Sequence, residues 1–138
     1  MKNIFAVFFV FFILPLSAWA GALILLNHVH LPKLFELSYM IWKDPNDISA
    51  LNNRAILTSN MLGSSTNWAK SDLKRVIAIE PENANSLWRL GRLYRHEDRE
   101  KALIYYQRAL DSYCQQESKY YSENGCDDTA LEITYLKQ

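Results

Sequence analysis

Residues 73–110 establish the kind of fold, and they read LKRVIAIEPENANSLWRLGRLYRHEDREKALIYYQRAL. An apolar run stops at Pro81, which cannot continue a helix, so one helix is predicted to end just before it. Each of the two segments that follow places apolar and small residues on one helical face. These residues are Leu90, Gly91 and Tyr94 in the first segment, and Ala102, Tyr106 and Ala109 in the second. The stretch therefore predicts a helix followed by a pair of helices with a short turn between them.

The order of these residues resembles the tetratricopeptide repeat, a helix pair of about 34 residues. The family pattern has a large apolar residue, Leu-Gly, Tyr, Ala, an aromatic residue and Ala in turn. It is met at Leu87, Leu90, Gly91, Tyr94, Ala102, Tyr106 and Ala109. The resemblance implies an all-α fold, with a short solenoid of antiparallel helix pairs over residues 28–113 and a capping helix within residues 114–138. It also implies a binding scaffold and not an enzyme.

A weaker repeat comes earlier in the chain. Pro45 and Pro81 lie 36 residues apart, and a helix over residues 31–43 is predicted to end before Pro45. Arg54 and Ala55 occupy the family's Leu-Gly positions, so Arg54 must either extend its charge to solvent or pair with an acid. The stack is expected to bury two tryptophans, Trp42 and Trp68, with a membrane interface as the alternative place for Trp42.

The helix that contains Ala109 is expected to continue toward Tyr120 and Tyr121. Glu123 to Gly125 is interpreted as a stop, since glycine suits a left-handed C-terminal cap. A capping box from Thr129 to Glu132 then predicts a last helix over residues 130–137. The expected contacts of that helix are Leu131, Ile133, Tyr135 and Leu136.

The chain has two cysteines, Cys114 and Cys126. A disulfide between them would close a short loop, stabilise the cap of the solenoid and suit an oxidising compartment. Two unrelated buried thiols are the alternative.

Residues 4–26 are 23 residues without a charge, and they hold five of the six phenylalanines. A helix of about 20 apolar residues can cross a bilayer, so residues 1–27 are predicted to form a transmembrane signal-anchor. The alternative is a signal peptide cleaved after Ala20, because Ala18-Trp19-Ala20 has the small-x-small form of a cleavage site. His28 and His30 are expected to form a polar collar and not a metal site, because their spacing puts them on different helical faces.

The charges on either side of this segment do not decide its orientation. The two cysteines favour an exported, periplasmic-type side for the rest of the chain. The predicted location is therefore a membrane, crossed once.

Balanced composition excludes several kinds of function. The chain has 15 basic and 15 acidic residues, whereas nucleic-acid binding needs an excess of positive charge. It contains no glycine-rich phosphate loop, no nucleophile motif and no zinc-spaced Cys/His set. No catalytic residue, metal, cofactor or small-molecule substrate is predicted.

The expected binding surface follows from the resemblance, because the first helix of each repeat lines a concave groove in this family. The carried-over positions are Asn85, Trp88, Arg92, Arg95 and His96 in the later repeat, and Ser49, Asn52, Ile56, Ser59 and Asn60 in the earlier one. Guanidinium groups beside an indole suit a partner that carries carboxylates. In the alternative interpretation these arginines are only hydrated, or are neutralised by the acidic residues that follow Ala109.

The predicted function is a non-catalytic scaffold that binds protein partners, most simply as part of a membrane complex, because two repeats leave exposed ends. One alternative is an accessory subunit of a membrane enzyme or energy-transducing complex, held mainly through its transmembrane helix. Another is an exported soluble adaptor, released by cleavage after Ala20.

Overall fold

The computed structural model describes residues 31–60 and 66–138, and these form six α-helices and no strand. The helices are α3 (Leu31–Lys43), α4 (Ile48–Ser59), α5 (Thr66–Ile79), α6 (Ala84–Tyr94), α7 (Arg99–Cys114) and α8 (Glu123–Lys137). The all-α prediction is confirmed for these residues. None of their helices combines the length and apolar character that crossing a membrane requires. The predicted membrane segment, residues 1–27, lies outside the described ranges.

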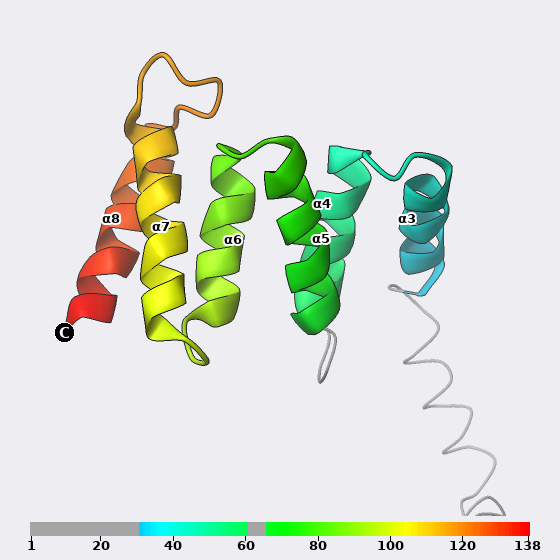
Figure 1. The fold of residues 1–138 in the computed structure, drawn as a ribbon, viewed down its shortest axis with the longest axis horizontal. Helices are drawn as coiled ribbons and strands as arrows, with labels where there is room; N and C mark the ends of the chain where they lie inside the picture. Colours follow the sequence, from blue (N-terminus) through cyan, green and yellow to red (C-terminus); the bar gives the residue numbers. More distant parts are fainter. Residues whose placement is uncertain (1–30, 61–65) are drawn as a thin grey trace, which may run out of the picture. The chain divides into compact units, whose positions relative to one another are not determined.

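The chain divides into two compact units, residues 1–36 and residues 37–138, and the packing described below belongs to the second. Neighbouring helices in the sequence pack together, α4 on α5, α5 on α6, α6 on α7 and α7 on α8, and successive helices run in opposite directions (Figure 1). The helix pairs predicted from the sequence are therefore present.

Polar residues set the starts of four helices. In each case a side-chain oxygen accepts a hydrogen bond from the backbone N–H three residues later, which satisfies a donor that the first turn leaves free. The capping residues are Asp47 for α4, Asn83 for α6, Asp98 for α7 and Ser122 for α8. Helices α3 and α5 end shortly before Pro45 and Pro81, as the sequence predicts.

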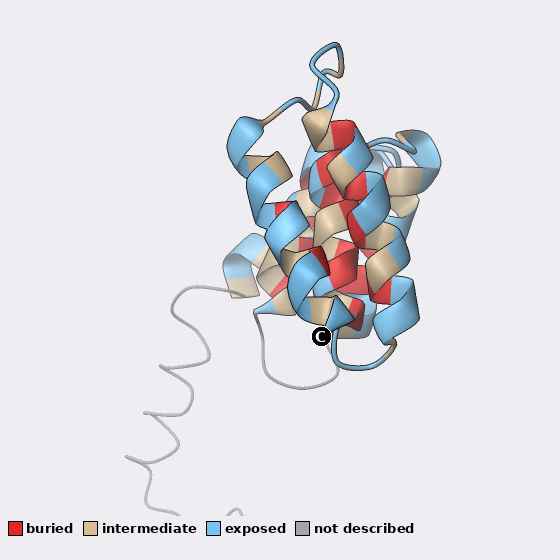
Figure 2. Ribbon diagram, turned by 90° about the vertical axis from the view of Figure 1, so that its left-hand side faces the viewer, coloured by how far each residue is buried: buried red, intermediate tan, exposed pale blue. Residues whose placement is uncertain are grey.

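The core lies between the helices, where buried residues face inward and exposed residues face outward (Figure 2). The larger apolar cluster contains Ala55, Ala69, Leu73, Leu90, Tyr94, Ala102, Tyr106 and Ile133. A smaller cluster contains Leu37, Ile41, Ala50, Leu51 and Val76. All six residues that the sequence places on the inner faces of α6 and α7 are buried.

Arg54 makes a buried ion pair, which is one of the two outcomes that the sequence allowed. Its Nε and Nη2 atoms donate to the two carboxylate oxygens of Asp72 on α5, each at 2.7 Å. The side chain of Asp72 is only 3% exposed. The hydrogen bonds from Arg54 to Asp72 raise the pKa of Arg54, which keeps the guanidinium charged. The pair joins α4 to α5 where the family has Leu-Gly.

The expectation that the stack buries Trp42 and Trp68 is wrong, since they are 76% and 63% exposed. Each tryptophan is adjacent in sequence to a buried residue, Trp42 to Ile41 and Trp68 to Ala69. Adjacent helical residues point about 100° apart, so the residue beside an inward-facing one leaves the core.

The C-terminal boundaries also differ from the prediction. Helix α7 ends at Cys114 instead of continuing toward Tyr120, and α8 begins at Glu123, so the predicted stop at Gly125 lies inside a helix. Thr129 does not cap a helix, because its Oγ1 donates to the Gly125 carbonyl at 2.6 Å within α8. Among the four predicted contacts of the last helix, Ile133 is buried, Leu136 is partly buried, and Leu131 and Tyr135 are exposed.

The early start of α8 has a physical cause that the sequence pattern hides. Ser122 caps the helix, and a disulfide joins Cys126 in the first turn of α8 to Cys114 at the end of α7. A Cβ atom on Gly125 would lie 2.8 Å from the ring of Tyr113, so the missing side chain allows α8 to approach α7 closely. Gly125 is therefore a packing residue and not a cap.

Residues 115–122 connect α7 to α8, and this loop is tied to the end of α5. The carboxylate of Glu80 accepts hydrogen bonds from Lys119 at 2.7 Å, from the Tyr120 hydroxyl and from Asn83 at 2.9 Å. These bonds, with that from Lys119 the strongest, lower the pKa of Glu80 to about 2. The disulfide therefore joins the helices at the two ends of the loop, and the Glu80 carboxylate binds two residues within it, Lys119 and Tyr120.

Replacing Tyr106 by phenylalanine is expected to leave stability unchanged or to raise it by up to about 1 kcal/mol. The Tyr106 hydroxyl is buried with no hydrogen-bond partner among residues 31–60 and 66–138, and burial raises its pKa to about 12. Urea unfolding measures the change. Tyr120→Phe serves as the control, since it removes a donor to Glu80 and should cost about 1 kcal/mol. A clear loss of stability in Tyr106→Phe would mean that the hydroxyl does have a partner.

Candidate functional site: a cationic pocket between α4 and α6

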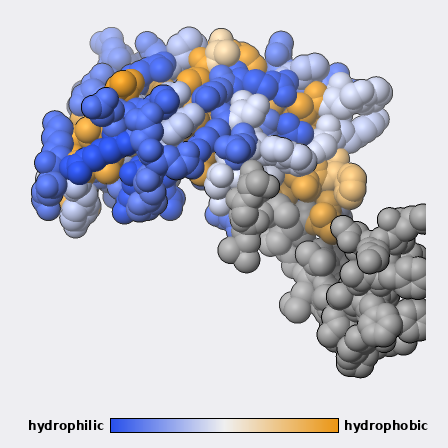
Figure 3. Space-filling view, turned by 60° about the horizontal axis from the view of Figure 1, so that its bottom comes forward, coloured by the Kyte–Doolittle hydropathy of each residue, from blue (hydrophilic) through white to orange (hydrophobic). Residues whose placement is uncertain are grey.

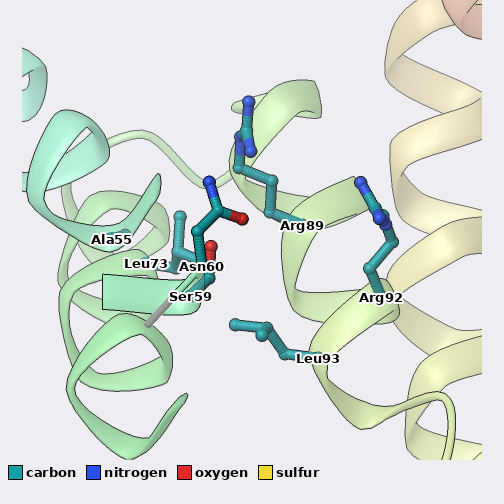
Figure 4. Close-up of a pocket in the computed structure, with 7 residues that line it drawn as sticks. All are labelled: Ala55, Ser59, Asn60, Leu73, Arg89, Arg92 and Leu93. Carbon is teal, nitrogen blue, oxygen red and sulfur yellow. The ribbon is translucent and has the colours of Figure 1, made fainter. Parts of the chain in front are cut away.

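A pocket of about 140 Å³ opens between α4, α5 and α6. It is lined by Ala55, Ser59, Asn60, Leu73, Arg89, Arg92 and Leu93 (Figure 4). The end of α4 supplies two neutral polar groups, whereas α6 supplies both charged ones. In the close-up the guanidinium groups of Arg89 and Arg92 extend to the same side of the pocket, with Asn60 facing them from α4. Three of these residues, Ser59, Asn60 and Arg92, belong to the predicted groove.

Arg89 is a charged residue of this pocket that the sequence analysis missed. Asn85, one turn earlier on α6, accepts a hydrogen bond from Arg89 Nε at 2.7 Å and so fixes the direction of the side chain. Arg89 is half-buried, and this burial lowers its pKa, with a further contribution from the positive charge of Arg92. A positive charge that is both desolvated and repelled by its neighbour is stabilised by an anion.

Arg92 lies over the ring of Trp88, with its guanidinium carbon 4.9 Å from the ring centroid. Trp88 itself packs against the main apolar cluster, so the indole is held in place. The attraction between a guanidinium group and an aromatic face is worth about 0.5–1 kcal/mol at an exposed site. It orients Arg92 and leaves its outer N–H donors available to a ligand.

Neither arginine pairs with a carboxylate of this chain. Every Asp and Glu lies within residues 31–60 and 66–138, because the remaining residues contain none. In these ranges the carboxylates pair with Lys33, Arg54, Lys70, Arg95, Lys101 and Lys119, and no ion pair involves Arg89 or Arg92. The two arginines of the pocket are therefore not neutralised by an ion pair within these ranges.

Two other residues of the predicted groove, Arg95 and Asn52, bond within the chain and do not line the pocket. Arg95 forms a salt bridge with Glu132 of α8 at 3.1 Å, so the acidic C-terminal part does neutralise this one arginine. Asn52 is part of the α4–α6 contact, because its Oδ1 accepts a hydrogen bond from Ser86 at 2.8 Å. Ile56 is half-buried, while Ser49 and His96 are exposed.

A second recess adjoins the pocket on the α7–α8 side. It measures about 170 Å³ and is lined by Asn85, Trp88, Arg89, Tyr113, Gly125 and Asp128. Arg89 thus borders both recesses, and the predicted residues Asn85 and Trp88 lie in the second one. Three of the six main predicted binding positions, Asn85, Trp88 and Arg92, therefore line one or other of the two recesses, whereas Asn52, Ile56 and Arg95 line neither.

A simple sequence signal could have identified Arg89. Asn85, Arg89 and Arg92 follow the i, i+4, i+7 spacing of a single helical face, which requires no family pattern. The groove positions taken from the family omit Arg89, although the structure makes it half-buried. The face of the molecule that Figure 3 shows is mainly hydrophilic, with small hydrophobic areas between the polar ones.

The described residues contain no group of three or more His, Cys, Asp or Glu side chains that could hold a metal ion. Comparison of the sequence with known protein families and with curated proteins finds no match. The tetratricopeptide resemblance stays a prediction from the residue pattern.

Proposed function

We propose that this chain is a non-catalytic, tetratricopeptide-like scaffold, attached to a membrane, that binds an acidic segment of a protein partner at the α4–α6 pocket. The observation that carries the proposal is the pair Arg89 and Arg92, which share one pocket without a carboxylate from their own chain. A carboxylate from a partner would relieve both the desolvation of Arg89 and its repulsion from Arg92.

The polar groups around the pocket support a peptide as the ligand. Ser59 and Asn60 can donate and accept hydrogen bonds with a peptide backbone, while the arginines take its acidic side chains or its terminal carboxylate. Leu93 and the Trp88 ring offer apolar area beside the charges. An acidic segment with one apolar residue next to its carboxylates fits this combination.

Two further features support the proposed setting. The disulfide between Cys114 and Cys126 is typical of proteins in an oxidising compartment, which favours the exported side of a membrane. The uncharged residues 4–26 have the length of a membrane anchor. The proposed partner is a protein of a membrane complex on that side.

The test uses the full chain in mild detergent and a fluorescent glutamate-rich peptide with a free C-terminus. Arg89→Glu combined with Arg92→Glu is expected to weaken binding by at least about tenfold, because each lost charge-assisted hydrogen bond is worth about 1.5–3 kcal/mol. Fluorescence anisotropy measures the affinity. A lysine-rich peptide of the same length should not bind.

The matched control is Arg99→Glu combined with Lys137→Glu. It changes the net charge by the same amount at two exposed positions outside the pocket. Binding close to that of the unmodified chain is expected. Equal weakening in both double variants would mean that the peptide is attracted only by the general positive charge of the chain, which would contradict the proposed site. Failure of the unmodified chain to bind the peptide would contradict it as well.

A further inference from the structure

Helix α3 has two different apolar faces within residues 37–43. Leu37 and Ile41 are buried against α4 and α5 in the smaller apolar cluster. Tyr39 and Trp42 point away from that cluster and are 62% and 76% exposed. Their rings stack on each other, with centroids 5.9 Å apart. The second face is called the aromatic face of α3 below.

The aromatic face of α3 belongs to neither apolar cluster of the described residues, yet its chemistry is specific. Tyrosine and tryptophan join a large apolar ring to one polar group, and they are enriched where a bilayer meets water. Lys43 closes the same helix with a positive charge. Aromatic residues on one face of a helix with lysines beside them are typical of helices that lie in the membrane interface.

The position of this face in the sequence also points to a membrane surface as its partner. The uncharged stretch of residues 4–26 ends five residues before Leu31, the first residue of α3. Five residues span at most about 18 Å, and Tyr39 lies eight residues further along the helix, which adds about 12 Å. If residues 4–26 enter a bilayer, the aromatic face is within reach of its surface.

We infer that the aromatic face of α3, formed by Tyr39 and Trp42, rests on the lipid surface of the membrane. This inference depends on the membrane attachment in the proposed function. It assigns α3 a second role, because Leu37 and Ile41 join it to the repeat stack while Tyr39 and Trp42 join it to lipid. The stack would then be held at the membrane surface through α3 as well as through the preceding segment.

The experiment places the full chain in vesicles of phosphatidylcholine and phosphatidylglycerol and measures quenching of tryptophan fluorescence by brominated lipids. One variant keeps only Trp42, with Trp19, Trp68 and Trp88 replaced by Phe. The matched control keeps only Trp68, which is similarly exposed on α5. The expected result is loss of Trp42 emission with lipids brominated near the headgroup, less loss with deeply brominated lipids, and no loss for Trp68.

A second measurement does not depend on the Phe replacements. A nitroxide label on Trp42→Cys, in an otherwise native chain with its disulfide intact, reports collisions with lipid-soluble oxygen and with a water-soluble nickel complex. More frequent collision with oxygen supports lipid contact. Protection from both reagents would indicate a protein partner or a second copy on this face, and it would overturn the inference.

Alkaline extraction of the same vesicles separates this inference from the proposed anchor. Vesicles that retain the chain while Trp42 is unquenched would overturn the contact of α3 with lipid and leave the anchor in place. Removal of the chain by alkali after Trp42 quenching has been recorded would support the contact and contradict the anchor. Absence of both signals would contradict both.

Discussion

Gly91→Val is expected to destabilise the protein by about 3 kcal/mol, at the upper end of the cost of overpacking a core. A Cβ atom at this position would lie 2.8 Å from the ring of Tyr106, which is fully buried. Helix propensity alone predicts that the substitution would stabilise the protein, since glycine is a poorer helix former than valine by several tenths of a kcal/mol. The sign of the change therefore reports whether α6 and α7 approach as closely as the structure shows. Urea unfolding of the full chain in detergent measures it.

Two controls separate the clash from other effects of valine. Ala78→Val changes an exposed position of α5 and should cost only about 0.6 kcal/mol, the difference in helix preference. Combining Gly91→Val with Tyr106→Leu removes the opposing ring and should recover part of the loss, which a double-mutant cycle measures. Unchanged or increased stability in Gly91→Val would contradict the packing of this helix pair.

Asp72→Ala is expected to cost about 2–4 kcal/mol, because it leaves the partly buried guanidinium of Arg54 without its carboxylate. The two hydrogen bonds of 2.7 Å are the contact that joins α4 to α5 at this position. Arg54 would keep only its 3.2 Å bond to the Ser38 hydroxyl. Thermal or urea unfolding measures the loss.

The control for this prediction is Asp111→Ala, an exposed aspartate in α7, whose effect should stay within about 0.5 kcal/mol. Replacing both partners, Arg54→Leu with Asp72→Leu, should restore most of the stability, since an apolar pair often substitutes well for a buried ion pair. If Asp72→Ala were as mild as Asp111→Ala, the pair would contribute nothing to the fold.

The part of the fold that the sequence predicts well is the part in which periodicity and breakers agree. From Leu73 to Leu110 the apolar face, the glycine and the proline all indicate the same helix pair, and the structure buries Leu90, Gly91 and Tyr94 accordingly. The two prolines give the ends of α3 and α5 for the same reason. These are local signals, so they can be recognised without knowing what packs against them.

The errors concern residues whose role depends on a distant partner. Gly125 has the local signature of a helix end, but it lies in α8 because the disulfide and the ring of Tyr113 determine its surroundings. Trp42 is large and apolar, yet its neighbour Ile41 occupies the inner face. Whether the guanidinium of Arg54 extends to solvent or pairs with an acid depended on Asp72, which lies eighteen residues away in the sequence.

For the candidate site too, the prediction succeeded where a local pattern was enough and failed where a distant residue decided the outcome. The groove positions carried over from the family include Asn85, Trp88 and Arg92, and the structure places all three at adjoining recesses. It also shows that Arg95 pairs with Glu132, whereas Arg89 has no acidic partner in its own chain. Which arginine remains unpaired depends on the position of α8, and that position could not be read from the order of residues.

The most direct test of the proposed role places a photoreactive amino acid at Asn60, which is exposed and lines the pocket, in cells that produce the full chain. The same amino acid at Ile104, exposed on α7 and outside the pocket, is the control. We expect position 60 to crosslink a partner through an acidic segment, position 104 not to crosslink it, and the crosslink at position 60 to disappear when Arg89 and Arg92 are both changed to Glu. A crosslink at position 60 that survives this charge reversal, or one that forms equally from position 104, would contradict binding at the α4–α6 pocket.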